Sequence, residues 1–72
     1  MVEVRVGMRA VFDPSLDLNG NGADVVRGKM EVGTVDFVHY KHRWFQVVYG
    51  TGQRISFLFD DIGKGKKVVL YD

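Results

Sequence analysis

The sequence predicts one small all-β domain, and two observations carry this prediction. Apolar residues repeat at every second position wherever the chain shows a clear pattern. No stretch of the chain shows an apolar stripe with the 3.6-residue period of a helix. The 72 residues suffice for a single domain, expected to span residues 1–72, and they include no cysteine for a disulfide. Packing alone must therefore hold this fold together.

The first predicted strand covers residues 2–12 and is interrupted or bent at Gly7. Even-numbered positions in this segment carry apolar side chains, and charged side chains occupy three of the odd-numbered positions. Pro14 is expected to end the strand, because proline has no N–H group to donate to a sheet ladder. Residues 15–30 are rich in turn formers and poor in apolar positions, so they predict one long loop.

Four further strands are expected after this loop. Two tight turns separate the first three of them, at Lys41–Arg43 and Gly50–Gln53, and a short helical turn or loop in "DDIGKGK" precedes the last. The expected strands cover residues 31–40, 44–49, 54–59 and 67–71. Five short strands spaced by about ten residues predict a strongly bent barrel, because closure removes exposed sheet edges.

The two-residue period also predicts which side chains of the middle hairpin build the core. The core-facing set is expected to be Val35, Phe37, Phe45, Val47 and Tyr49. Val38 and Tyr40 are expected on the opposite face of their strand. Trp44 has the opposite parity to Phe45, so it is expected to point outward beside Tyr40 on the neighbouring strand.

The order of these parts resembles a five-stranded Src-homology-3-like barrel, with one long loop after the first strand and a short helical turn before the last. The segment "RGKMEVGTVDFVH", Arg27–His39, is similar to the entry strand of ribosomal and transcription-factor barrels of the KOW and Tudor type. The sequence lacks the "ALYDY" segment and the proline-tyrosine pair of the peptide-binding members, so the resemblance does not imply polyproline binding.

A nearer resemblance is to short proteins of Gram-positive bacteria and their prophages. These share a "GTV..V...HRWF.V.Y" core, here Gly33–Tyr49, and a "DIGK" turn, here Asp61–Lys64. Because they have no assigned activity, the resemblance implies a fold and no function.

The charge distribution marks a candidate partner-binding site on the middle hairpin. Ten basic and nine acidic residues give a net charge of +1, but the chain from Phe37 to Phe59 contains no carboxylate. The partner-binding residues predicted from this segment are Tyr40, Lys41, His42, Arg43, Trp44 and Arg54. An acidic loop around Asp17 and Asp24 is expected to face them.

Three interpretations of this site remain open. The first is a binding or adaptor module that engages another protein through Tyr40, Trp44 and the acidic loop. The second is a nucleic-acid-binding barrel, in which Lys41, Arg43 and Arg54 contact phosphates and Trp44 stacks on a base. The third, by analogy only, is a self-associating structural protein of a phage or prophage. A structural alternative is that Trp44 covers an open end of the barrel.

Enzymatic activity and cofactors are not expected. The only histidines, His39 and His42, lie in or beside a tight turn and have no nearby carboxylate in the sequence to orient them. The stretch "DLNGNGAD" begins like a calcium loop at Asp17, but Gly28 stands where the closing glutamate is needed, so no metal is predicted. The absence of cysteine and of a long apolar segment predicts a cytoplasmic protein that does not enter a membrane.

Overall fold

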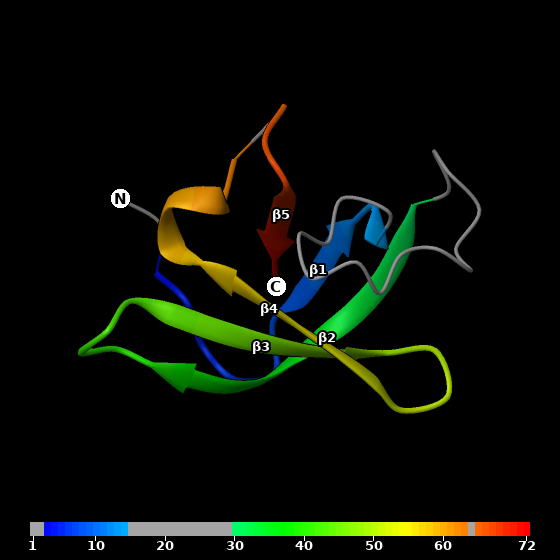
Figure 1. The fold of residues 1–72 in the computed structure, drawn as a ribbon, viewed down its shortest axis with the longest axis horizontal. Coiled ribbons are helices and arrows are strands. Elements are labelled where there is room, and N and C mark those ends of the chain that lie inside the picture. Colours follow the sequence, from blue (N-terminus) through cyan, green and yellow to red (C-terminus); the bar gives the residue numbers. More distant parts are fainter. Residues whose placement is uncertain (1–2, 15–29, 64) are drawn as a thin grey trace.

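The computed structural model describes residues 3–14, 30–63 and 65–72, and these form a five-stranded antiparallel sheet (Figure 1). The strands are β1 (Arg9–Phe12), β2 (Glu31–His39), β3 (Trp44–Tyr49), β4 (Gln53–Leu58) and β5 (Val68–Tyr71). Their order in the sheet is β4-β3-β2-β1-β5, and a single 3-10 turn, Phe59–Asp61, precedes β5. The predicted fold class, with five strands and a helical turn before the last one, is confirmed.

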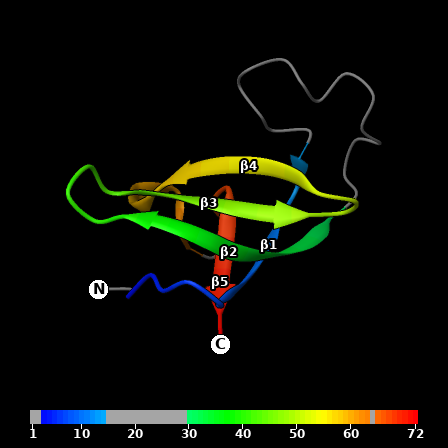
Figure 2. The ribbon, with the colours of Figure 1, turned by 90° about the horizontal axis from the view of Figure 1, so that it is seen from below.

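The sheet folds back on itself because β2 is shared between its two halves. The beginning of β2 pairs with β1, and its remainder pairs with β3. Gly33 belongs to both pairings, opposite Ala10 on one side and Tyr49 on the other. As a result β1 and β5 cross over the layer formed by β2, β3 and β4 (Figures 1 and 2).

The hydrophobic core lies between these two halves. Its buried members are Val4, Met8, Ala10, Phe12, Val35, Phe45, Val47, Ile55, Phe57 and Val68. The Phe12 ring meets Tyr49 and Phe57 edge-on, with centroid distances of 5.0 and 5.4 Å. Val35, Phe45 and Val47 are buried and Tyr49 packs against them, as the alternation predicts.

The N-terminal segment is less regular than its sequence pattern suggests. β1 begins only at Arg9, and a turn at Val6–Gly7 precedes it, where Gly7 has a φ of 98°. The Gly7 N–H donates to the Val35 carbonyl, and the Val35 N–H donates to the Met8 carbonyl, each over 2.8 Å. The predicted interruption at Gly7 is confirmed. The predicted parity fails at Val6, whose side chain is exposed because the turn redirects the chain.

A β-bulge at Asp36 reverses the alternation in β2. Val35 pairs with Val47, but Phe37 pairs with Gln46, so Asp36 is an extra residue with no partner on β3. Phe37 therefore lies on the outer face, 44% exposed, and Val38 packs against the core. The prediction that placed Phe37 in the core and Val38 opposite it is wrong, because one inserted residue exchanges the two faces of the strand.

The 3-10 turn links the two ends of the sheet. The Asp61 carboxylate accepts the Leu58 N–H over 2.9 Å, as expected for an acidic residue that caps this turn. Ile62 forms a bridge with Val68, and the Gly63 N–H donates to the Val68 carbonyl over 2.9 Å. No ladder joins β4 to β5 in the described part of the chain, so both remain edge strands. The described residues include no helix long and apolar enough to cross a membrane.

Candidate functional site

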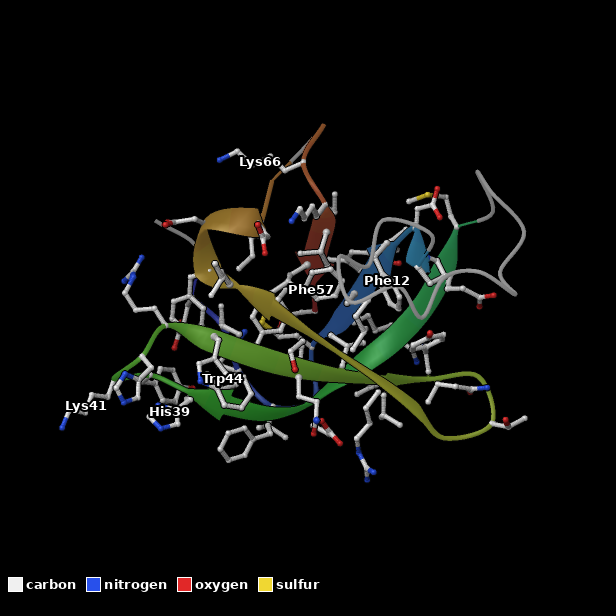
Figure 3. All side chains as sticks on the ribbon, viewed as in Figure 1. Phe12, His39, Lys41, Trp44, Phe57 and Lys66 are labelled. Carbon is white, nitrogen blue, oxygen red and sulfur yellow. The ribbon has the colours of Figure 1, made fainter. Side chains whose placement is uncertain are left out.

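Four side chains form what we term the outer aromatic patch: Phe37, His39, Trp44 and Leu58. Trp44 lies opposite His39 on β2 and opposite Leu58 on β4, so the patch spans three strands. The Trp44 ring stacks on His39 at 5.6 Å and contacts Phe37 at 5.3 Å, both measured between centroids. Figure 3 shows Trp44 and His39 together on the hairpin, away from Phe12 and Phe57 in the core.

The patch lies on the outer face of the strands whose inner face forms the core. Phe45 is fully buried, and its neighbour Trp44 therefore points to the opposite face, as the two-residue period predicts. Phe37 reaches the same face only because of the bulge at Asp36. Leu58 is 55% exposed and Phe37 is 44% exposed, so large apolar side chains border Trp44 on both sides.

The turn after β2 fixes one end of the patch. Residues 40–43 form it, and Arg43 has a φ of 58°, in the left-handed region that few residues other than glycine adopt. The His42 N–H donates to Nδ1 of His39 over 3.3 Å, and the two imidazole rings lie 4.6 Å apart. This bond holds the His39 ring beside Trp44 and leaves Lys41 exposed at the tip of the turn (Figure 3).

Tyr40 and Arg43 lie on the other side of this turn. The Tyr40 hydroxyl donates to the Val4 carbonyl over 2.8 Å, and its ring lies 6.4 Å from that of Phe59. The Arg43 guanidinium sits over the Phe59 ring at 5.2 Å. The prediction that Tyr40 lies beside Trp44 is therefore wrong, because Tyr40 belongs to the turn and faces the N-terminal segment and the 3-10 turn.

A cleft of about 490 Å³ opens on this second side. It is lined by Glu3, Val4, Tyr40, Arg43, Phe59, Asp60, Ile62 and Lys66. Its polar groups carry both signs of charge, with two acids and two bases around an apolar floor. The predicted site residues are thus not brought together: Trp44 lies in the outer aromatic patch, and Tyr40 and Arg43 line this cleft. Lys41, His42 and Arg54 belong to neither.

Replacement of Tyr40 by phenylalanine tests the structural role of this side chain. The change removes the hydrogen bond to Val4, so we expect a loss of about 1 kcal/mol in the free energy of unfolding. Urea denaturation measures this loss. Tyr71→Phe is the matched control, since no hydrogen bond of the exposed Tyr71 hydroxyl is found in the described residues. Equal stability of the two variants would contradict this role of Tyr40.

Two of the three predicted phosphate-binding cations already face carboxylates. Nε of Arg54 lies 3.3 Å from the Asp36 carboxylate, and a guanidinium nitrogen of Arg43 lies 4.0 Å from that of Asp60. Among the described residues, Lys41 has no such carboxylate neighbour. The acidic loop predicted around Asp17 and Asp24, and the calcium-like pattern with it, lie outside the described residues.

The sequence pattern missed three members of the outer aromatic patch. Phe37 was expected in the core, and no local signal marks the bulge that turns it outward. The contacts of His39 with Trp44 and His42 place it in the patch, and neither contact can be read from the sequence. Leu58 lies in a predicted strand, but its place beside Trp44 depends on the β3–β4 register. The short turn at residues 50–52 sets that register. Pairing the two predicted strands across this turn would have placed Leu58 opposite Trp44.

The chemistry of the patch is that of apolar contact and ring stacking beside a basic turn. No group of three side chains suited to hold a metal ion occurs in residues 3–14, 30–63 and 65–72. Comparisons of the chain with protein-family models, with curated proteins and with solved structures find no match.

Proposed function

We propose that this domain is a non-enzymatic module that binds a protein segment through the outer aromatic patch. The observation that carries the proposal is the outward position of Phe37 against Trp44, where neither ring is needed to fill the core. Large exposed apolar side chains gathered on one face of a small domain are typical of interaction sites. Aromatic rings supply much contact area and lose little side-chain entropy on binding.

The charges around the patch indicate the chemistry of the partner. Lys41 and His42 are exposed at the turn that ends the patch, and no carboxylate occurs between Phe37 and Phe59 in the sequence. A partner segment with an aromatic or aliphatic anchor, followed by an acidic residue toward Lys41, complements this surface.

Nucleic acid is the second candidate, supported by the stack of His39 on Trp44 with Phe37 beside it. Bases stack on such rings in single-strand-binding proteins. The ion pairs of Arg54 and Arg43 count against this candidate, because each must break before its guanidinium can neutralise a phosphate. Protein binding is therefore the function that the geometry supports better.

A peptide selection tests the proposal. A displayed library of random dodecapeptides is selected on the wild-type domain, and each enriched peptide is then titrated against Phe37→Ser and Trp44→Ser. We expect both substitutions to weaken binding by at least about tenfold, because they remove central apolar contacts. Isothermal titration calorimetry measures the affinities, and circular dichroism confirms that each variant is folded.

Val69→Ser is the matched control, since Val69 is exposed to a degree similar to Phe37 but lies on β5, outside the patch. It should leave the affinity within about twofold of wild type. Full binding of the enriched peptides by the Phe37 and Trp44 variants would overturn the proposal. So would the absence of enriched peptides combined with salt-sensitive binding of single-stranded oligothymidylate, which would instead support the nucleic-acid function.

A further inference from the structure

The open edge of β4 lies directly beside the outer aromatic patch. β4 is the last strand on its side of the sheet, and only β3 pairs with it in the described residues. Its register with β3 runs without a shift from Gln53 to Leu58, so no bulge twists this edge away. An unprotected edge of this kind presents backbone donors and acceptors to a further strand.

The hydrogen bonds of the hairpin identify which backbone groups are free. The Phe59 N–H donates to the Arg43 carbonyl on the β3 side. Backbone groups of successive residues point to opposite edges of a strand, so those of Ile55 and Phe57, at steps of two from Phe59, also face β3. The backbone groups of Arg54, Ser56 and Leu58 then point away from β3. The Leu58 N–H agrees with this assignment, because it donates to the Asp61 carboxylate instead of to β3.

The free groups form a short, regular row. Arg54 and Ser56 each offer an N–H and a carbonyl, and the two residues are spaced by about 7 Å. This is the pattern that an added strand of about five residues can satisfy. The capped Leu58 N–H marks one end of the row, and the turn at residues 50–52 marks the other.

Arg54, the charged residue of β4, does not block the pairing of a further strand with this edge. Native proteins often protect an open edge with a charged side chain that opposes further pairing. Here the Arg54 side chain reaches across β3 to Asp36 on β2, with Nε of Arg54 3.3 Å from the carboxylate. The β4 segment also lacks proline and lysine. Within residues 3–14, 30–63 and 65–72, this edge is consequently open beside Leu58.

From these observations we infer that the partner binds as an extended segment that adds a strand to the free edge of β4. This inference rests on the proposed function and specifies its mode. Main-chain hydrogen bonds to Arg54 and Ser56 supply affinity, and alternate side chains of the segment lie on the outer face beside Leu58. The preferred partner is therefore an extended segment that has no proline opposite Ser56 and has an apolar side chain next to Leu58.

Ser56→Pro tests this binding mode with little disturbance of the fold. The substitution removes an N–H that points away from β3, so the β3–β4 ladder keeps all of its hydrogen bonds. Ser56→Ala is the matched control, because it changes the side chain and keeps the N–H. For a peptide selected on the wild type, we expect at least about tenfold weaker binding to Ser56→Pro and unchanged binding to Ser56→Ala.

Hydrogen exchange of the wild-type domain provides a second, independent readout. Addition of the selected peptide should protect the amides of Arg54 and Ser56, and it should leave that of Ile55, already bonded to β3, unchanged. N-methylation of alternate peptide amides should abolish binding at the positions that face β4. These two measurements need no domain variant, so they decide the matter even if Ser56→Pro fails to fold.

The outcomes separate this inference from the proposed function. If Phe37→Ser and Trp44→Ser weaken binding while the Arg54 and Ser56 amides gain no protection, the patch binds its partner without an added strand and the inference is overturned. If binding is independent of the patch, the proposed function fails and the inference falls with it. If the wild type is a dimer by ultracentrifugation that Ser56→Pro converts to a monomer, a second copy of the chain occupies the edge, and the peptide-binding mode is overturned.

Discussion

Replacement of Phe45 by alanine should remove about half of the free energy of unfolding of this protein. Phe45 is fully buried, and its ring lies 5.7 Å from that of Phe57 and 6.2 Å from that of Phe59. Loss of such a side chain costs about 3–5 kcal/mol, through lost apolar burial and the cavity left behind. A domain of this length has a total stability of only about 4–10 kcal/mol. Urea denaturation followed by circular dichroism measures the change.

Val32→Ala is the appropriate comparison for this experiment. Val32 also lies in a central strand, but its side chain is 52% exposed on the outer face. The alanine variant should lose less than about 1 kcal/mol, since surface substitutions have small effects. Similar losses for Val32→Ala and Phe45→Ala would mean that Phe45 is not enclosed by the core, and they would contradict the strand orientation on which the outer aromatic patch depends.

Replacement of Gly33 by alanine should destabilise the domain for a different reason. A β-carbon at this position would lie 2.5 Å from a methyl group of Val47 and 2.7 Å from the carbonyl oxygen of Val48. The Val48 backbone belongs to the β2–β3 ladder and cannot withdraw without opening it. We expect a loss of about 1–3 kcal/mol in the free energy of unfolding, as is usual for overpacked sites.

Thr34→Ala provides the matched control, because Thr34 is the next residue in β2 and its side chain is exposed. Hydrogen exchange should show faster opening of the β2–β3 amides in the Gly33 variant and an unchanged rate in the Thr34 variant. An alanine at position 33 that leaves the stability and the exchange rates unaltered would show that β2 and β3 can separate at this point without cost.

Much of the architecture could be read from apolar spacing. The period of two placed Phe45 and Val47 in the core and Trp44 on the opposite face, because β3 is regular from end to end. The same period accounts for Ile55 and Phe57 of β4, which are both buried. Glycine-containing segments such as Gly50–Gln53 and "DDIGKGK" marked turns, because tight turns need particular backbone geometry.

The candidate site was harder to predict because it combines residues from three strands and a turn. Trp44 and Tyr40 are close in sequence and were expected to act together. The turn at residues 40–43 sends Tyr40 toward Val4 and Phe59, while Trp44 meets Phe37 and His39. Side chains alternate between two faces only within a continuous strand, and Tyr40 lies just beyond the end of β2.

The sequence by itself determined an all-β chain, its division into five strands and the side of β3 that faces the core. These follow from local covalent geometry, because side chains of a strand alternate between its two faces. Only the tertiary structure decided that Phe37 joins Trp44 outside the core and that Arg54 turns toward Asp36, away from the open edge of β4. The position of Phe37 depends on a bulge, and the contact of Arg54 with Asp36 depends on the order and register of β2, β3 and β4. Both are set by the fit between strands, which leaves no local mark on the chain.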